Sequence, residues 1–456
     1  MPCRRHFLHA ANTLSEKQRR GSPASSSVLL VLMKLLPLYI VFVVESAHAV
    51  TDPNDVLALM QIKASIDPAT IPATSCLGSW DFSADPCQSR NGERFTCGIE
   101  CMLASASQNA TPTGEYERVI SLKFDIAGYA GVLSPWLGNL TELRLLQIPG
   151  NALAGEIPIT IGKLSLLTAL DLSSNSFTGP IPDSIAWLMN LQSLNVAHNK
   201  LSGSIPPTMN SLRYLTDLRL QGNLLNGGFP DIRNLGLLGV IDASDNKLSG
   251  PFPRQLPPSI YSLSLRNNEL GGKLPTNIIL KLNQLNILDL SNNTFSGCVN
   301  DGILGHPSLQ QLNLSMNRLS QLRVHPRHVR QSPMTALDLS YNLLSGPLPS
   351  FFALMNQLSS LSLQYNSFHG AIPQLYGAKV TEDMPYMKPF ERLILDGNYL
   401  TGPLPLPFTE EGSSVHSVAA TSLGDNCFQS CPRKFTFCQG KQQKTETLCR
   451  LFNASP

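Results

Sequence analysis

The cysteines of this chain are the residues whose type and spacing point most directly to a chemistry. Eight of the ten form two clusters of four, Cys76, Cys87, Cys97 and Cys101 near one end and Cys427, Cys431, Cys438 and Cys449 near the other. Four cysteines allow three disulfide pairings, and the sequence does not choose among them. Zinc is the alternative, but both clusters contain a C-x3-C interval and no histidine accompanies them. We therefore predict disulfides, no metal and an oxidising compartment, with Cys298 as a free thiol or a packing residue.

Catalytic chemistry has no comparable support in the sequence. The candidates for acid and base work are four aspartates, Asp171, Asp242, Asp289 and Asp338, which recur at one position of a repeated segment. Repetition explains them better than paired catalytic carboxylates would. The sequence also contains no Gly-rich phosphate loop, no Val-Ala-Ile-Lys, no His-Arg-Asp and no Asp-Phe-Gly, so it carries no kinase signature. We predict no catalytic residues and no cofactor, and the chain is not expected to be an enzyme.

The repeated segment is Leu-x-x-Leu-x-Leu-x-x-Asn, and it dictates most of the expected fold. One copy consists of Leu167, Leu170, Leu172 and Asn175, and twelve copies lie between residues 119 and 398. A period of about 20 to 29 residues with this consensus is the signature of leucine-rich repeats, each of which forms one coil of a solenoid. The twelve asparagine positions are Ala127, Asn151, Asn175, Asn199, Asn223, Asn246, Asn268, Asn293, Asn317, Asn342, Asn366 and Asn398.

Alternation within the segment predicts which side chains are buried. The leucines point to one side of a short strand and the x residues to the other, so stacked coils bury a column of leucines. The asparagine is predicted to bond buried backbone groups, because an unsatisfied polar group would cost about 1 to 3 kcal/mol. The leucine column is Leu146, Leu170, Leu194, Leu218, Ile241, Leu263, Leu288, Leu312, Leu337, Leu361 and Leu393. A second apolar column is Leu153, Phe177, Leu201, Leu225, Leu248, Leu270, Phe295, Leu319, Leu344, Phe368 and Leu400.

These patterns predict an α/β fold, a right-handed leucine-rich-repeat solenoid with a short parallel concave sheet and 3-10 or irregular segments on the convex side. Disulfide-bonded caps are expected at both ends, because terminal coils expose the apolar core. The expected boundaries are a presequence at 1–49, a cap at 50–117, repeats at 118–408 and a second cap with tail at 409–456. Two turns, 297–300 and 319–333, lack the usual Gly-x-x-Pro, and 374–389 is extra material. We interpret all three as loops rather than binding segments.

The first 49 residues have the features of a secretory signal. A charged start at Lys34 precedes the apolar stretch Leu35 to Val44 and the small residues Ala47 and Ala49. We favour cleavage after Ala49 over an uncleaved anchor, because the apolar run is short and interrupted. No later stretch reaches spanning length, so a carboxy-terminal anchor is not expected. The expected location is secreted, or at the extracellular face of the plasma membrane or cell wall.

The charge balance changes when the presequence is set aside. The chain has 34 Lys and Arg against 32 Asp and Glu, and the first 49 residues hold six of the former and two of the latter, which leaves 28 against 30. A near-neutral chain without a basic stripe is not expected to bind nucleic acid.

Several motifs resemble one plant family. The turn Leu-x-Gly-x-Ile-Pro, as in 153–158 and 201–206, resembles the plant-specific class of leucine-rich repeats. The segment 55–65, followed by Trp80 and Asp85-Pro86-Cys87, is similar to the amino-terminal cap of plant receptor-like proteins, receptor kinases and polygalacturonase inhibitors. Residues 118–122 and 133–140 resemble the first repeat of that group. Over residues 52–449 the chain resembles a plant leucine-rich-repeat receptor-like protein without a kinase domain.

The resemblance implies an extracellular recognition protein that takes part in defence or development signalling. Such a protein would bind a peptide or protein partner on its concave face and would signal through a separate co-receptor kinase. A secreted inhibitor of pathogen cell-wall hydrolases is the first alternative, since it shares the caps and the period. A structural cell-wall protein is the second alternative, and the missing Ser-Pro-rich tail argues against it.

Outward x residues of the concave sheet are the candidate contacts for a partner, and Tyr and Arg are favoured interface anchors. The predicted partner-binding residues are Asn195, His198, Asp217, Arg219, Gln221, Arg266, Tyr341, Gln364 and Tyr365. The alternative is a solvated face with no ligand at these positions. A basic run could meet a cell-wall polysaccharide such as pectin, although solvated surface is the commoner explanation. That run is Arg323, His325, Arg327, His328 and Arg330.

Five triplets are candidate glycosylation sites, Asn109, Asn139, Asn292, Asn313 and Asn453. Asn109 and Asn453 are weaker candidates because proline follows each triplet. Asn313 is expected on the open face of a strand, where a glycan would block a ligand.

Overall fold

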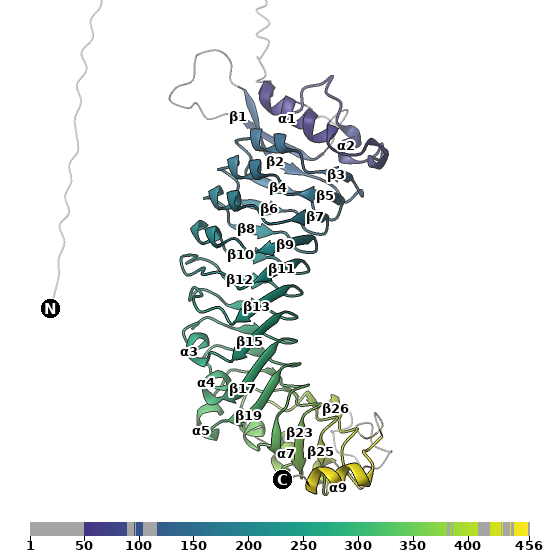
Figure 1. Ribbon diagram of the computed structural model, residues 1–456, viewed down its shortest axis with the longest axis vertical. Helices are drawn as coiled ribbons and strands as arrows, with labels where there is room; N and C mark the ends of the chain where they lie inside the picture. The colour runs from purple at the N-terminus through teal and green to yellow at the C-terminus, as the bar shows by residue number, and fades with distance from the viewer. Residues whose placement is uncertain are drawn as a thin grey trace, which may run out of the picture. The chain divides into compact units, whose positions relative to one another are not determined.

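The computed structural model describes residues 50–88, 95, 97–103, 116–380, 384, 386–408, 420–429, 431, 438 and 442–454. The predicted presequence and the sequon at Asn109 lie outside these residues. Figure 1 shows the described chain as a stack of coils, in which each coil contributes one strand to a long sheet. The predicted leucine-rich-repeat solenoid with a parallel sheet is therefore confirmed.

The long sheet has 14 strands, which follow one another in chain order and are parallel after the antiparallel pair β1 and β2. We call its solvent-facing side the concave face. Its strands are β1 Ile99–Leu103, β2 Glu117–Lys123, β4 Leu145–Gln147, β6 Ala169–Asp171, β8 Ser193–Asn195, β10 Asp217–Arg219, β12 Val240–Asp242, β14 Ser262–Ser264, β16 Ile287–Asp289, β18 Gln311–Asn313, β20 Ala336–Asp338, β22 Ser360–Ser362, β24 Arg392–Ile394 and β26 Ala420–Ser422.

Two shorter sheets, which the sequence analysis did not predict, follow the asparagine in each coil. One has nine strands: β3 Ala130–Val132, β5 Ala152–Glu156, β7 Ser176–Gly179, β9 Lys200–Ser204, β11 Leu224–Gly227, β13 Lys247–Pro251, β15 Glu269–Lys273, β17 Thr294–Asn300 and β19 Arg318–Arg323. The other has three: β21 Ser345–Pro347, β23 Ser367–Gly370 and β25 Tyr399–Leu400. The break between the two sheets falls between β19 and β21. Within β19, Gln321 stands where other coils have a glycine with positive φ, such as Gly297 (91°) and Gly346 (104°).

Short helical segments occupy the remaining side of the coils, and those before residue 80 and after residue 445 belong to the caps. The 3-10 segments on the coils were predicted, whereas the α-helices of the later coils were not. The 3-10 segments are η1 Pro68–Thr70, η2 Pro135–Asn139, η3 Ile159–Lys163, η4 Asp183–Trp187, η5 Pro207–Ser211 and η6 Leu406–Phe408. The α-helices are α1 Pro53–Ala64, α2 Cys76–Ser79, α3 Thr276–Ile279, α4 Asp301–Leu304, α5 Pro326–Val329, α6 Phe351–Leu354, α7 Gln374–Val380 and α9 Glu446–Ala454.

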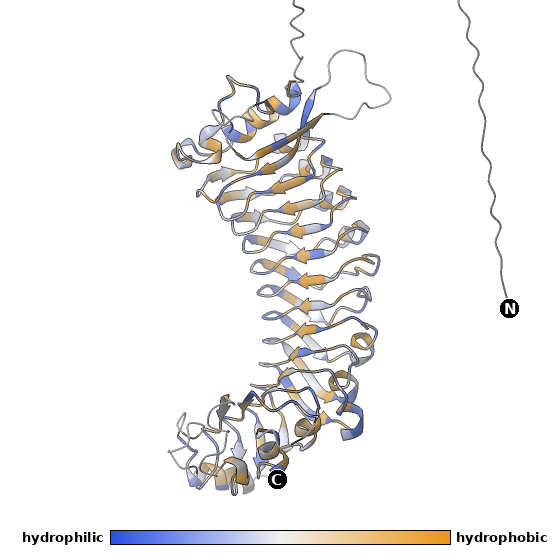
Figure 2. Ribbon diagram, turned by 180° about the vertical axis from the view of Figure 1, so that it is seen from behind, coloured by the Kyte–Doolittle hydropathy of each residue, from blue (hydrophilic) through white to orange (hydrophobic). Residues whose placement is uncertain are grey.

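Both predicted apolar columns are buried, and hydrophobic residues recur at the same point of successive coils (Figure 2). The asparagines between them bond as expected. Asn199 Oδ1 accepts from the Phe177 amide of the preceding coil at 3.0 Å, and its Nδ2 lies 3.0 to 3.2 Å from the carbonyls of Leu172, Val196 and Ala197. Each asparagine thus satisfies backbone groups of two coils, which the strands leave unpaired.

One further coil lies in the segment that the sequence analysis assigned to the second cap. β26 pairs with β24, and Asn426 accepts from the Leu400 amide at 3.1 Å, as the repeat asparagines do. This coil does not match the repeat consensus, because Thr421, which pairs with Leu393, stands where a leucine is expected. Its other anchors, Leu423 and Phe428, are buried.

The cap cysteines form four disulfides, two in each cluster. One of the three possible pairings is thereby identified for each cluster, and these sulfur atoms are not available as zinc ligands. The bonds are Cys76–Cys97, Cys87–Cys101, Cys427–Cys449 and Cys431–Cys438. Cys298 is a half-buried free cysteine in β17. The first cap also packs Trp80 against Phe95 and Phe124, with ring centroids 5.7 and 6.0 Å apart.

The extra material at 374–389 is partly built into the core. It includes α7, whose Lys379 is fully buried and donates from Nζ to the Met355 carbonyl at 2.6 Å. The same carbonyl also accepts from the Leu358 amide at 3.3 Å. Lys379 Nζ lies 5.1 Å from the centroid of the Phe390 ring. Burial lowers the pKa of Lys379 to about 8.

Replacing Lys379 with methionine is expected to stabilise the protein by about 2 kcal/mol at pH 7. Below pH 8 the lysine is charged in both states, and only the folded state bears the cost of burying that charge. Each pKa unit corresponds to about 1.4 kcal/mol, and loss of the hydrogen bond offsets about 1 kcal/mol of the gain. Between pH 8 and 10.5 the folded wild type loses its proton first, so its stability rises toward that of the variant.

Urea unfolding of the Lys379→Met variant and the wild type at pH 7 and pH 9.5 tests this expectation. Lys388→Met, at an exposed lysine of the same segment, is the matched control and should be nearly neutral at both pH values. A stability difference for Lys379→Met that stays constant with pH would contradict the titration of a buried lysine.

Candidate ligand-binding face

The residues on either side of each buried leucine project from the concave face, and the sheet holds them in fixed register. Asn195 of β8 lies opposite Arg219 of β10, and Ser193 lies opposite Asp217. Adjacent strands are about 4.8 Å apart. A residue type that recurs at one repeat position therefore forms a straight row across the sheet.

One such row contains the recurrent aspartates, and the structure supplies a reason for their recurrence. Asp171 Oδ1 accepts from the amide and the hydroxyl of Ser173 at 2.9 and 2.6 Å, where the chain leaves the strand. Asp242, Asp289 and Asp338 use Oδ1 in the same way toward the amide two residues later, at 2.8 to 3.0 Å. Satisfying this amide is a structural role, consistent with the expectation that these residues are not catalytic.

The first group of predicted contacts lies on β8 to β14. Arg219 forms an ion pair with Asp217 at 3.1 Å, and this hydrogen-bonded carboxylate raises the pKa of Arg219. Arg266 is exposed, and no ion pair to it is found among the described residues. Gln221 is half-buried, and its Oε1 is a buried acceptor without a partner in the described part of the chain. Asn195 is also half-buried, and its Oδ1 accepts from the Ala197 amide at 3.2 Å.

The structure places three predicted contacts beside the concave face rather than on its strands. His198, Tyr341 and Tyr365 have φ values of 55°, 52° and 51°, so they occupy the left-handed position just before the repeat asparagine. We call this row, which also contains Met316, the ledge. Asparagine, aspartate or glycine usually occupies such a position, because other side chains are strained there. Large residues at these positions therefore strain the backbone, and packing of the core does not require them there.

Two of the ledge residues form an aromatic pair. The rings of Tyr341 and Tyr365 are stacked, with centroids 4.5 Å apart and planes inclined by 20°. Gly397 follows in the row, and a Cβ there would lie 2.4 Å from the Tyr365 ring, so the glycine leaves room for it. Tyr341 is 46% exposed, whereas Tyr365 and its neighbour Gln364 are half-buried. This second group is separated from the first by β16 and β18.

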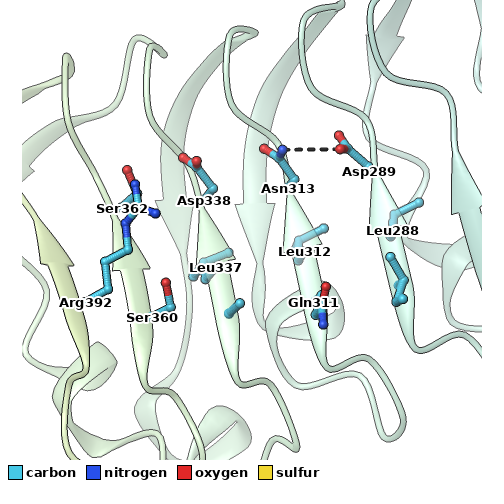
Figure 3. A pocket seen from close by; sticks show the side chains of 12 residues that line it. Leu288, Asp289, Gln311, Leu312, Asn313, Leu337, Asp338, Ser360, Ser362 and Arg392 are labelled. Carbon is cyan, nitrogen blue, oxygen red and sulfur yellow. Dashed lines mark hydrogen bonds between the residues drawn. The ribbon is translucent and has the colours of Figure 1, made fainter. Parts of the chain in front are cut away.

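A hollow of about 240 Å³ lies on the concave face between β16 and β24, and the sequence analysis did not identify it. Figure 3 shows its lining, in which Asp289, Asn313 and Asp338 come from three successive strands. Ser362 and Arg392 complete the polar side, and Leu288, Leu312 and Leu337 form the floor. The sequence did not predict the hollow, because five coils form it together and no single repeat has a pattern that indicates it.

The basic run surrounds α5, away from the long sheet. Its three arginines are exposed and form no ion pair within the described part of the chain. His328 Nδ1 lies 2.5 Å from Asp301 Oδ2, and this hydrogen bond lowers the pKa of Asp301. His325 stacks near His328, with ring centroids 5.1 Å apart.

The sequons differ in position. Asn139 ends η2, and Asn292 is exposed on the ledge, where its Nδ2 donates to Asn267 Oδ1 at 2.5 Å. Asn313 lies on β18 in the hollow and donates to Asp289 Oδ2 at 3.3 Å. A glycan on Asn313 would therefore occupy the concave face, as expected. Asn453 belongs to α9.

Family models match both the first cap and the repeats. Residues 52–95 match the leucine rich repeat N-terminal domain, and residues 166–188, 190–212 and 334–355 match the leucine rich repeat. Helices long and apolar enough to cross a membrane are not found in the described ranges.

The curated relatives include several receptor-like proteins of plants. Receptor-like protein 7 of Arabidopsis thaliana is 34% identical over 176 residues, which is 38% of this chain and 16% of the relative. Cuscuta receptor 1 of Solanum lycopersicum is 31% identical over 171 residues, which is 31% of this chain and 15% of the relative. The matched part of the chain thus spans about a sixth of the length of these relatives.

Solved structures of plant receptors share the fold. The plant peptide hormone receptor RGFR1, in complex with RGF2, has a TM-score of 0.56 and 26% identity, with 66% of this chain and 50% of the receptor covered. The leucine-rich-repeat ectodomain of the receptor kinase GASSHO1/SCHENGEN3 from Arabidopsis thaliana has a TM-score of 0.51 and 23% identity, with 82% and 50% covered. At 23% identity, the second likeness concerns the fold alone.

Proposed function

We propose that this chain, which belongs to the leucine-rich-repeat receptor-like proteins of plants, binds an extracellular peptide or protein on its concave face. Any signal would pass through a separate co-receptor kinase. The observation that carries the proposal is the placement of large residues at strained backbone positions on the ledge beside a polar hollow, with Met316 and Tyr341 exposed and Tyr365 half-buried. Tyr341 and Tyr365 stack on each other outside the core, and we attribute their position to contact with a partner.

The likeness to a peptide hormone receptor supports the choice of ligand class. That receptor was solved with RGF2 bound, and it shares the solenoid with this chain at 26% identity. The concave face also offers the rigidity that recognition needs, because each strand of the long sheet is hydrogen-bonded to its neighbours.

Alanine at His198, Arg219 and Tyr365 together is expected to weaken binding of the natural partner at least tenfold. Two interface anchors that each contribute about 1 kcal/mol or more account for a change of this size. The partner is first captured from a cell-wall extract with the full chain. Its affinity for the wild type and the variant is then measured by titration on a sensor surface.

A matched control removes the same residue types elsewhere. His325, Arg254 and Tyr386 are exposed and lie outside the long sheet and its ledge, so the triple alanine variant should bind as the wild type does. Unchanged binding by a folded concave variant would refute the proposal. Loss of binding in the control variant alone would place the site outside the concave face and its ledge, and would also refute the proposal.

A further inference from the structure

We infer that the concave face from β12 to β22 recognises an extended basic peptide, in which positive side chains recur at every third residue. The inference rests on the proposed function and specifies its ligand. Three features of the face carry it: carboxylates on alternate strands, a buried hydroxyl without a partner among the described residues, and a strand spacing that matches an extended peptide.

The carboxylate row follows from the register of the parallel strands. Asp242 lies opposite Ser264, Ser264 opposite Asp289, Asp289 opposite Asn313, and Asn313 opposite Asp338. A carboxylate thus occurs on β12, β16 and β20, with a neutral polar residue on each strand between. Figure 3 shows Asp289, Asn313 and Asp338 side by side at the same height of their strands.

In each carboxylate, Oδ2 is the oxygen that could accept a hydrogen bond from a ligand. Oδ1 of each is engaged with the amide two residues later. Oδ2 of Asp289 accepts from Asn313 at 3.3 Å, and for Oδ2 of Asp242 and Asp338 no hydrogen bond is found among the described residues. Asn313 makes the same turn contact to the Ser315 amide at 3.1 Å. The turn therefore requires an acceptor oxygen but not a negative charge. The fold does not explain the charges of Asp242, Asp289 and Asp338.

The next position in the row carries an independent sign of a ligand. Ser362 lies opposite Asp338 and lines the hollow, where Figure 3 shows it beside Arg392. It is only 5% exposed, and its hydroxyl oxygen has no hydrogen-bond partner in the described structure. An unsatisfied buried hydroxyl is unfavourable. A backbone carbonyl or amide of a bound peptide would satisfy it.

The spacing between the carboxylates matches a peptide in the extended polyproline II conformation. Alternate parallel strands are about 9.6 Å apart, and a polyproline II chain advances about 9.3 Å in three residues. A peptide that crosses the strands in this conformation would present a lysine or arginine to Asp242, Asp289 and Asp338 in turn. A β-strand advances only about 6.6 Å in two residues or 9.9 Å in three, and in three residues its side chains change sides.

A cation limits the row on one side. Arg219 of β10 lies opposite Asp242 and is paired with Asp217. On the other side the row continues through Ser362 to Ile394 of β24, and Arg392 lies two residues away from it, opposite Ser360. Arg266 is the exposed cation beside the stretch, two residues beyond the end of β14. The ledge with Met316, Tyr341 and Tyr365 runs along the same coils and would receive the apolar part of the peptide.

The test uses a synthetic peptide, (Lys-Pro-Pro)3, as the probe and a peptide of the same composition with its three lysines contiguous as the comparison. Binding to the full chain, with its N-glycans trimmed, is measured by calorimetry at low and physiological ionic strength. We expect the spaced peptide to bind about tenfold more tightly than the contiguous one. We also expect a triple variant, Asp242→Asn, Asp289→Asn and Asp338→Asn, to lose that preference and about tenfold in affinity.

Asparagine is chosen because Asn313 shows that this position tolerates it with the turn intact. The control variant Asp183→Asn, Asp231→Asn and Glu269→Gln removes the same charge from exposed residues outside the long sheet and should bind the probe normally. Equal binding of the two peptides, or an equal loss in both variants, would overturn the inference. Either result leaves the proposed function standing if the natural partner still requires His198, Arg219 and Tyr365.

Ser362→Ala adds a readout that a structural role would not produce. The hydroxyl has no partner to lose among the described residues, so unfolding by urea should be unchanged or slightly harder. Probe binding should weaken about threefold. A variant that is destabilised and binds normally would show that the hydroxyl serves the fold and would remove it from the site.

Discussion

Alanine at Asn246 is expected to lower the free energy of unfolding by about 3 kcal/mol. Its Oδ1 accepts from the Leu225 amide at 3.0 Å, and its Nδ2 lies 3.0 to 3.3 Å from the carbonyls of Leu220, Ala243 and Ser244. The variant leaves a buried amide without its partner and weakens the bonding of three carbonyls. One unsatisfied buried group costs about 1 to 3 kcal/mol, and the vacated volume adds to the loss.

Urea unfolding followed by circular dichroism measures this effect, and Asn226→Ala is the matched control. Asn226 is exposed in β11, so its replacement should change stability by less than about 0.5 kcal/mol. Asn246→Asp should be at least as harmful as alanine, because it removes the donors and buries a charge. A near-neutral Asn246→Ala variant would contradict the view that the asparagines join one coil to the next.

Alanine at Asp55 is expected to cost about 4 kcal/mol and to release the first cap from the repeats. Asp55 is fully buried in α1 and makes two 3.0 Å bonds to the Arg118 guanidinium. Its Oδ2 also accepts from the Val119 amide of β2 at 2.9 Å. Removing one partner of a buried ion pair costs about 3 to 5 kcal/mol, because the other charge is left without compensation.

Hydrogen exchange distinguishes release of the cap from general unfolding. In the Asp55→Ala variant, amides of α1 and β2 should exchange much faster, while those of β10 to β20 should stay protected, because coils interact mainly with their neighbours. Asp67→Ala is the control, since Asp67 is exposed and only caps η1. Uniform loss of protection along the array would show that the cap and the repeats unfold as one unit.

The sequence alone was sufficient to predict the coils and their interior. Leucine columns and the asparagine row repeat with one period, so each prediction for one coil was supported by its copies. The same logic failed at single positions. The coil that contains β26 was not recognised because Thr421 stands in place of the consensus leucine, and the break between the two shorter sheets, which follows β19, was not predicted.

The candidate site was predictable only in part. Alternation along a strand determines which residues face outward, and this placed Asn195, Asp217 and Arg219 on the concave face. It did not reveal that His198, Tyr341 and Tyr365 lie on a separate ledge, because that depends on a left-handed backbone just after the strand. The pairing of the cap cysteines was open for a similar reason, since it depends on how the caps fold back.

By itself, the sequence of this protein determined the period, the buried columns and the resemblance to plant leucine-rich-repeat receptor-like proteins, because these depend on neighbours within one coil and on repetition. The tertiary structure alone decided the row of Asp242, Asp289 and Asp338, the hollow beside Ser362 and the stacked tyrosines. These features join residues about 24 to 50 positions apart, and only the register of one coil on the next brings them to neighbouring or alternate strands, within about 10 Å of each other.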